Sequence, residues 1–111
     1  MEPSANETWL IEAGDAVIQR KARDGFSSLP PIERLMYCLW VADYGMRNAG
    51  DLATAGDVYA NFQTEGLRLA RDAGLPETCE AFALKAPDLQ RQYFERFDLI
   101  CGELRRALLS P

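Results

Sequence analysis

The chain has 111 residues, 48% of them hydrophobic, and its 17 acidic and 12 basic side chains give a net charge of −5. This length and composition predict one domain over residues 1–111 with a core of its own, and they exclude a disordered chain. The negative charge disfavours direct nucleic-acid binding, and the absence of histidine excludes Cys-His and Ser-His nucleophiles and removes the commonest metal ligand.

The sequence shows no membrane-spanning segment, no signal peptide and no paired-cysteine motif. No apolar run approaches the roughly 20 residues that span a bilayer, and the acidic start lacks the order of a signal peptide. Cys38, Cys79 and Cys101 lie far apart and form no CxxC pair, so we expect buried free thiols. The sequence therefore predicts a cytoplasmic protein that does not enter the membrane.

The first predicted helix covers about residues 6–23. Ser4 and Asn6 are candidate N-caps, and Gly25 is a candidate stop. Basic side chains in the last turn suit the negative end of the helix dipole. We interpret these charges as a solvated face.

The second predicted helix covers about residues 31–48, with Pro31 in its first turn and Gly50 as its stop. Its apolar residues lie on nearly every side of the helix: Ile32, Leu35, Met36, Leu39, Trp40, Val41, Ala42, Tyr44 and Met46. A helix of this kind must be covered by other helices. It is therefore predicted to be the central helix.

Asp43 is the one acidic residue in an unusual position, because it falls on the apolar stripe of this helix. A partly buried carboxylate needs a partner. Arg47 is four residues further on and can meet it on the same face. A structural pair is favoured over a catalytic carboxylate, and Asn48 and Asp51 complete the set of structural or ligand-contact candidates.

The rest of the chain predicts a connector and three further helices. Residues 51–56 are predicted to be a connector, with room for one helical turn, and the helices cover about residues 57–73, 77–85 and 87–109. Gly66 on the apolar stripe of the first of these indicates close approach of a neighbouring helix. No alternating strand pattern occurs, so we predict an all-α fold, a compact bundle of about five helices around the helix at 31–48.

Two pairs of carboxylates are candidates for acid-base or metal chemistry, Asp51 with Asp57 and Glu77 with Glu80. Neither pair has the spacing of an EF-hand or a Glu-x-x-His motif. Helix N-termini favour acidic residues as caps, so we interpret both pairs as structural.

Four aromatic residues, Trp9, Trp40, Tyr59 and Tyr93, are either core side chains or the walls of a ligand pocket. Their helical spacing favours the core. No glycine-rich phosphate loop is present. The sequence thus predicts no catalytic residue, no cofactor and no metal site, and a protein that is not an enzyme.

The end of the second predicted helix, residues 43–51, resembles a family of bacterial domains of unknown function that includes a DNA-mimic protein of Neisseria. Those domains carry an acidic residue on a helix, followed by a turn of the Asn-Gly-Gly-Phe type. Asn48 and Gly50 match this turn, whereas Ala49 replaces a glycine and Asp51 stands at the position of the aromatic residue.

Two downstream segments are similar to the same family, Leu67–Leu75 and the final helix with Tyr93 and Phe97. The resemblance covers about residues 29–108. It implies a non-enzymatic helical module and, in its best-known member, an acidic surface that occupies a DNA-binding protein. The acidic residues of this chain are interspersed with arginine, whereas a mimic needs carboxylates spaced like phosphates.

The sequence therefore predicts a bacterial, cytoplasmic protein-interaction module whose acidic surface sequesters a basic, DNA-binding partner. An immunity or antitoxin-like partner protein fits the same observations. A small-ligand-binding domain that uses Asp43, Arg47 and Asn48 is the alternative from a different class. A homodimer is a further alternative.

Overall fold

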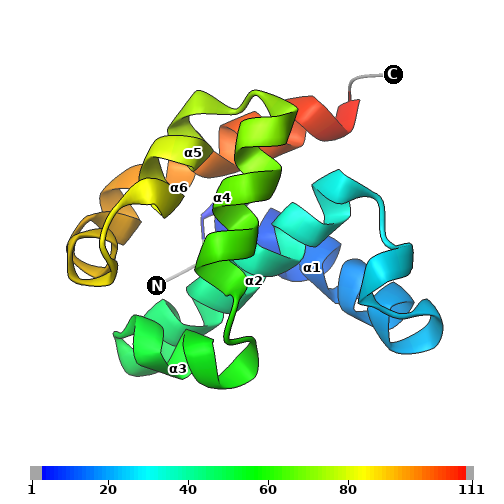
Figure 1. Ribbon diagram of the computed structural model, residues 1–111, viewed down its shortest axis with the longest axis horizontal. Coiled ribbons are helices and arrows are strands. Elements are labelled where there is room, and N and C mark those ends of the chain that lie inside the picture. Colours follow the sequence, from blue (N-terminus) through cyan, green and yellow to red (C-terminus); the bar gives the residue numbers. More distant parts are fainter. Residues whose placement is uncertain (1–3, 110–111) are drawn as a thin grey trace.

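The computed structural model describes residues 4–109, and in that range it is all-helical with no strand, which confirms the predicted fold class. Six α-helices form a compact globule (Figure 1). They are α1 (Ala5–Asp24), α2 (Pro31–Ala49), α3 (Leu52–Val58), α4 (Phe62–Ala73), α5 (Pro76–Ala83) and α6 (Ala86–Leu109), with a short 3-10 turn, η1 (Phe26–Ser28), before α2.

Most helix ends lie within two residues of their predicted positions, because local capping chemistry sets them. The Ser4 hydroxyl accepts a hydrogen bond from the Glu7 amide and starts α1. Gly50 and Gly74 end α2 and α4 in the left-handed conformation, with φ of 72° and 70°. Only glycine adopts this conformation without steric cost.

The region after α2 corrects the sequence prediction. The expected connector at 51–56 is the helix α3, and the helix expected from residue 57 begins only at Phe62, as α4. The Asp51 carboxylate accepts a hydrogen bond from the Thr54 amide and thereby caps a separate helix. Gly45 lets this helix pack closely on α2, since a Cβ there would lie 2.7 Å from the Asp51 carbonyl oxygen.

Helix α2 contacts α1, α3, α4 and α6. Figure 1 shows α4 crossing in front of α2, and α6 running behind α5 and behind the upper part of α4. Buried side chains lie on nearly all sides of α2, as its apolar pattern predicts. The other helices contribute large core side chains that include Leu10, Val17, Phe62, Leu69, Phe82, Leu89, Tyr93, Phe97, Ile100 and Leu104.

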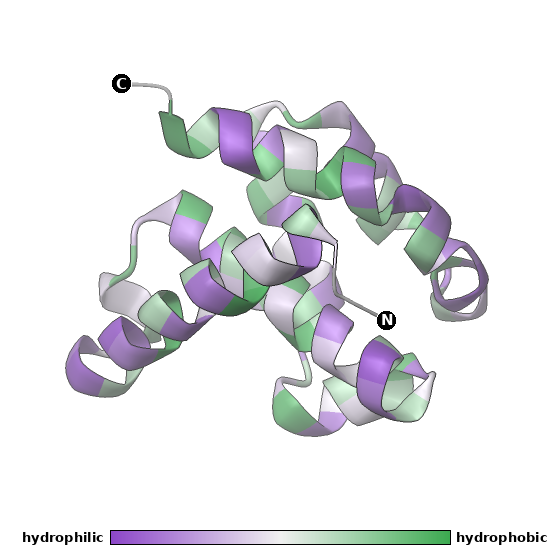
Figure 2. Cartoon of the chain, turned by 180° about the vertical axis from the view of Figure 1, so that it is seen from behind, coloured by the Kyte–Doolittle hydropathy of each residue, from purple (hydrophilic) through white to green (hydrophobic). Residues whose placement is uncertain are grey.

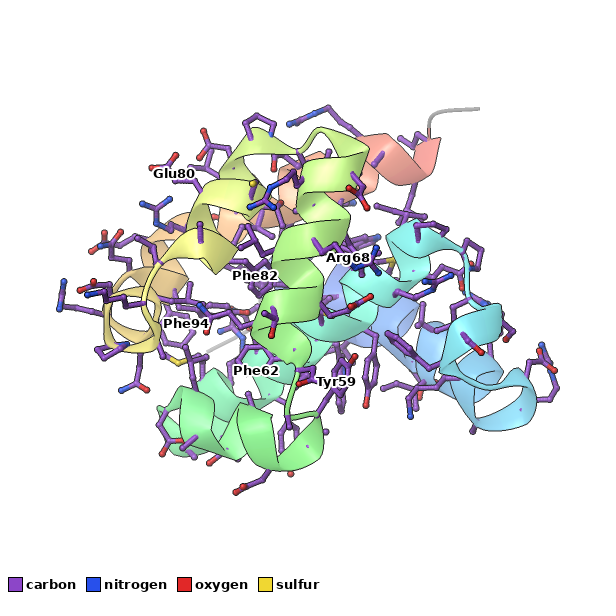
Figure 3. The ribbon with its side chains drawn as sticks, viewed as in Figure 1. Tyr59, Phe62, Arg68, Glu80, Phe82 and Phe94 are labelled. Atoms are coloured by element: carbon purple, nitrogen blue, oxygen red, sulfur yellow. The ribbon has the colours of Figure 1, made fainter. Side chains whose placement is uncertain are left out.

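The approach of α5 to α4 depends on Gly66. A Cβ at this position would lie 3.2 Å from the Phe82 ring, and Figure 3 shows Phe82 directed from α5 toward α4. The close helix approach predicted at Gly66 is therefore confirmed.

The outer helices are amphipathic. Figure 2 shows hydrophilic and hydrophobic residues following one another along α1 and α6, so each helix has a polar and an apolar side. Within residues 4–109, no helix combines the length and the hydropathy needed to cross a membrane.

Candidate functional site

Asp43 lies where α1, α2 and α6 meet, and its carboxylate is almost fully buried, with 7% of the residue exposed. Both carboxylate oxygens lie 3.0 Å from Arg47 Nε, which donates to them. The Tyr93 hydroxyl, from α6, donates to Oδ1 across 2.7 Å. The structure thus contains the predicted Asp43–Arg47 pair and adds a partner that the sequence did not indicate.

Arg47 extends the cluster to the other two helices. Its Nη1 lies 3.2 Å from the Glu7 carboxylate on α1. Its guanidinium carbon lies 5.1 Å from the centre of the Phe94 ring and 4.7 Å from that of Phe97, both on α6. Ion pairing and cation–π contact therefore hold one guanidinium at the junction of three helices.

Burial raises the pKa of the Asp43 carboxyl, and the hydrogen bonds from Tyr93 and Arg47 oppose that shift. Burial, and then the charge of Asp43, raise the pKa of Tyr93 well above its ordinary value. The hydroxyl therefore keeps its proton and serves as a donor. With its oxygens engaged by Arg47 and Tyr93, the Asp43 carboxylate connects helices and is not presented as a free general base.

Asn48 and Asp51 occupy different places. Asn48 is exposed at the end of α2, where its Nδ2 donates to the Tyr44 carbonyl oxygen across 2.8 Å. Asp51 caps α3, and its hydrogen bond from the Thr54 amide lowers its pKa. Asp51 is therefore not part of the cluster around Asp43.

A hollow of about 240 Å³ opens beside the cluster. It brings together three of the four candidate residues, and it is lined by Ile11, Trp40, Asp43, Tyr44, Arg47 and Asn48. Ile11 comes from α1, so no spacing along α2 could have indicated its presence. The apolar stripe of α1 was visible in the sequence, but Ile11 is not on that stripe.

Glu103 is a second buried acidic residue, and no motif or spacing in the sequence indicates its burial. Its Oε2 accepts a hydrogen bond from the Glu77 amide, 2.9 Å away. Its Oε1 accepts from the Thr78 amide at 2.7 Å and from the Thr78 hydroxyl at 2.8 Å. A carboxylate from α6 thus caps the N-terminus of α5, which is a structural role.

The four aromatic residues considered as pocket walls do not form one pocket. Tyr93 is buried beside Asp43, whereas Trp40 and Tyr59 both pack against the Tyr37 ring. Trp9 lies beneath an arginine of α6. Of these four aromatic residues, Trp40 alone lines the hollow.

Two of the three cysteines are too deeply buried to act as reactive thiolates. Cys38 and Cys101 are buried, and burial raises the pKa of each to about 12. Cys79 is half-buried. In the part of the chain that the structure describes, no three histidine, cysteine or acidic side chains lie close enough to hold a metal ion.

Comparisons of the chain with protein-family models, with curated proteins and with solved structures found no match.

Proposed function

We propose that this protein is a non-enzymatic interaction module that binds a basic partner protein through the face where α1, α2 and α6 meet. We call this surface the three-helix face and define it by Ile11, Trp40, Tyr44, Arg47 and Phe94. The observation that carries the proposal is the convergence of large exposed apolar side chains on this face.

Three such side chains come from three different helices. Ile11 is 55% exposed, Tyr44 41% and Phe94 52%. Ile11 and Tyr44 share the rim of the hollow with Arg47, and Arg47 reaches the Phe94 ring, so the three form one surface. Grouped exposed apolar side chains with a polar rim are typical of protein interaction sites.

The charges around the face favour a basic partner. Glu7 and Asp15 lie one helical turn on either side of Ile11. Asp98 lies one turn after Phe94 and accepts a hydrogen bond from Asn6. Opposite charge on a partner would speed association and disfavour acidic competitors.

Two basic side chains of α6, Arg91 and Arg105, reduce this negative charge but do not reverse it. Arg91 is paired with Asp88 across 2.7 Å. Arg105 lies over the Trp9 ring and donates to Asn6. The remaining excess comes from Asp15 and from two carboxylates, Glu7 and Asp43, that share a single guanidinium.

A DNA-binding partner remains the first proposal, and an immunity or antitoxin-like pairing with a toxin is the second. Elsewhere on the molecule, acidic residues are paired with arginines, as in Arg20–Glu33 and Arg96–Glu80. The proposal therefore rests on the local three-helix face and not on a row of carboxylates that imitates phosphates. We further propose that the fold is a bundle around α2 and that the protein acts in the bacterial cytoplasm.

The test is affinity capture with matched variants of one helix. Phe94→Ser and Leu99→Ser remove side chains of almost equal exposure, 52% and 53%, from α6. Leu99 lies five residues beyond Phe94, so it projects from a different side of the helix. We expect the wild-type protein and the Leu99→Ser variant to capture the same basic protein, and the Phe94→Ser and Ile11→Ser variants to lose it.

The identity of the captured protein decides between the two proposed classes of partner. A DNA-binding protein favours sequestration, and a toxin nuclease favours the immunity role. Capture that is equal for all variants, or capture of an acidic protein, would contradict the proposed face.

A further inference from the structure

The hollow on the three-helix face has the size of a site for one side chain. Its volume of about 240 Å³ is below the roughly 300–1,000 Å³ of pockets that enclose a free small-molecule ligand. Its rim carries the exposed Ile11 and Tyr44, so a side chain that enters it would come from a segment lying on the face.

The charge around the hollow favours a cation. Among the residues that line it, the carboxylate of Asp43 is matched by the guanidinium of Arg47, and Glu7, which contacts Arg47 beside the hollow, adds a second carboxylate. The guanidinium is also covered by the rings of Phe94 and Phe97, so its charge is already compensated. An anion entering the hollow would meet this excess of negative charge, whereas a cation would reduce it.

The aromatic wall favours a planar cation. The Trp40 ring is stacked between two tyrosines, with interplanar angles of 13° to Tyr37 and 23° to Tyr44. Tyr44 is the last ring of this column, and 41% of the residue is exposed. A guanidinium can stack on such a ring and also donate to nearby carbonyl or carboxylate oxygens, which an ammonium does less well.

We propose that this hollow receives the guanidinium of one arginine from the basic partner segment. The inference rests on the proposed function and adds the side chain that the partner must supply. The arginine would stack on Tyr44 and lie near Asp43, while neighbouring apolar residues of the partner would cover Ile11 and Phe94. Lysine at the same position would keep the charge but lose the stacking.

The first experiment uses small probes, so that it does not depend on knowing the partner. N-acetyl-arginine amide is titrated into the ¹⁵N-labelled protein, and amide shifts are followed by NMR. N-acetyl-citrulline amide is the control, because it has the same shape without the charge. We expect saturable shifts at Ile11, Tyr44 and Asn48 with the arginine probe, and at least about fivefold weaker binding of citrulline.

Matched variants locate the cation. Tyr44→Leu should weaken the arginine probe about fivefold, whereas Tyr44→Phe keeps the ring and should bind as the wild type does. Tyr59→Leu removes a tyrosine that does not line the hollow and should have no effect. Circular dichroism and the unperturbed part of the amide spectrum show whether each variant is folded.

Equal binding of arginine and citrulline would overturn the inference, as would shifts that map away from the hollow or that persist in Tyr44→Leu. These failures differ from a failure of the proposed function. If a captured partner needs Phe94 but tolerates loss of each of its arginines, the face is correct and the arginine site is wrong. If the probe binds as expected but no basic partner depends on Phe94, the site is correct and the proposed function is wrong.

Discussion

Asp43 and Glu103, the two buried acidic residues within positions 4–109, have their charges satisfied in different ways. Asp43 is neutralised by side chains, a guanidinium from its own helix and a phenol from α6. Glu103 is satisfied by backbone amides at the start of α5 and by the Thr78 hydroxyl. The first arrangement reaches the surface through Arg47, whereas the second joins two helices.

This difference separates a region suited to recognition from a region suited to stability. A helix cap needs only one acceptor in a fixed place, and its partners are backbone groups that do not change. The stability of a cluster of charged side chains depends on each of its members, and the cluster also changes the charge of the nearby protein surface. Substitutions in the two regions should therefore differ in their effects on stability.

Arg47→Met should lower the free energy of unfolding by about 3 kcal/mol, because it leaves the buried Asp43 carboxylate without its cationic partner. Urea denaturation measures this loss. Arg91→Met is the matched control, since Arg91 belongs to an exposed pair with Asp88 and should change stability very little.

A double variant shows whether the stability lost in Arg47→Met comes from the unpaired Asp43 carboxylate. Asp43→Leu combined with Arg47→Met removes both members of the pair and should be more stable than Arg47→Met alone. If the double variant is the less stable of the two, the carboxylate contributes in a way that the ion pair does not explain.

Glu103→Ala should lower the free energy of unfolding by about 2 kcal/mol, because the amides of Glu77 and Thr78 lose their acceptor. Hydrogen exchange should quicken most at these two amides. Glu95→Ala, an exposed change on the same helix, should have almost no effect. Uniform acceleration across the whole molecule would show that Glu103 is not a local cap.

Tyr93→Phe should lower the free energy of unfolding by about 1.5 kcal/mol, since it removes only the hydroxyl that donates to Asp43. Tyr59→Phe provides the comparison, because the Tyr59 hydroxyl forms no hydrogen bond with any residue from 4 to 109. Equal effects of the two substitutions would indicate that the hydrogen bond at Asp43 does not stabilise the fold.

Asp43 and Asp51 should give pH dependences of opposite sign. Burial raises the pKa of Asp43 above its value of about 3.9 in the unfolded chain, so the native state binds the proton more tightly. The stability of the wild type relative to Asp43→Asn should therefore increase as the pH falls through this raised pKa toward 4.

The pKa of Asp51 is lowered by its hydrogen bond from the Thr54 amide. Its contribution is complete above the unfolded pKa and is lost as the pH falls through the lowered pKa. The advantage of the wild type over Asp51→Asn should therefore shrink in acid. Denaturation curves from about pH 3 to 7 would show the two trends, and parallel slopes would contradict the assignment of Asp43. Because the Glu7 carboxylate also contacts Arg47, Asp43→Asn is measured in the Glu7→Gln background as well.

Much of the fold could be predicted because helix boundaries and helix faces are encoded locally. The stop at Gly74 and the buried pattern of α2 follow from three- and four-residue spacings. The prediction was wrong between residues 51 and 61, where Asp51 starts a separate helix. The sequence of this segment is too short to predict a separate helix, because α3 is held in place by its packing on α2 at Gly45.

The candidate site was only partly predictable. Asp43 and Arg47 are four residues apart on one helix, so their pairing follows from helix geometry. Tyr93 is 50 residues from Asp43, and Glu7 lies on α1, so neither could be assigned from spacing. The hollow is likewise made by side chains of α1 and α2 together.

The sequence by itself determined that this protein is all-helical, that α2 is apolar on nearly all sides, and that Asp43 needs Arg47. These properties depend on hydrogen bonds and side-chain contacts within one or two helical turns. Only the tertiary structure decided that Tyr93 and Glu7 complete the cluster, that Glu103 caps α5, and that Ile11, Tyr44 and Phe94 share one exposed face. Those arrangements depend on how helices distant in the chain cross, which local spacing does not specify.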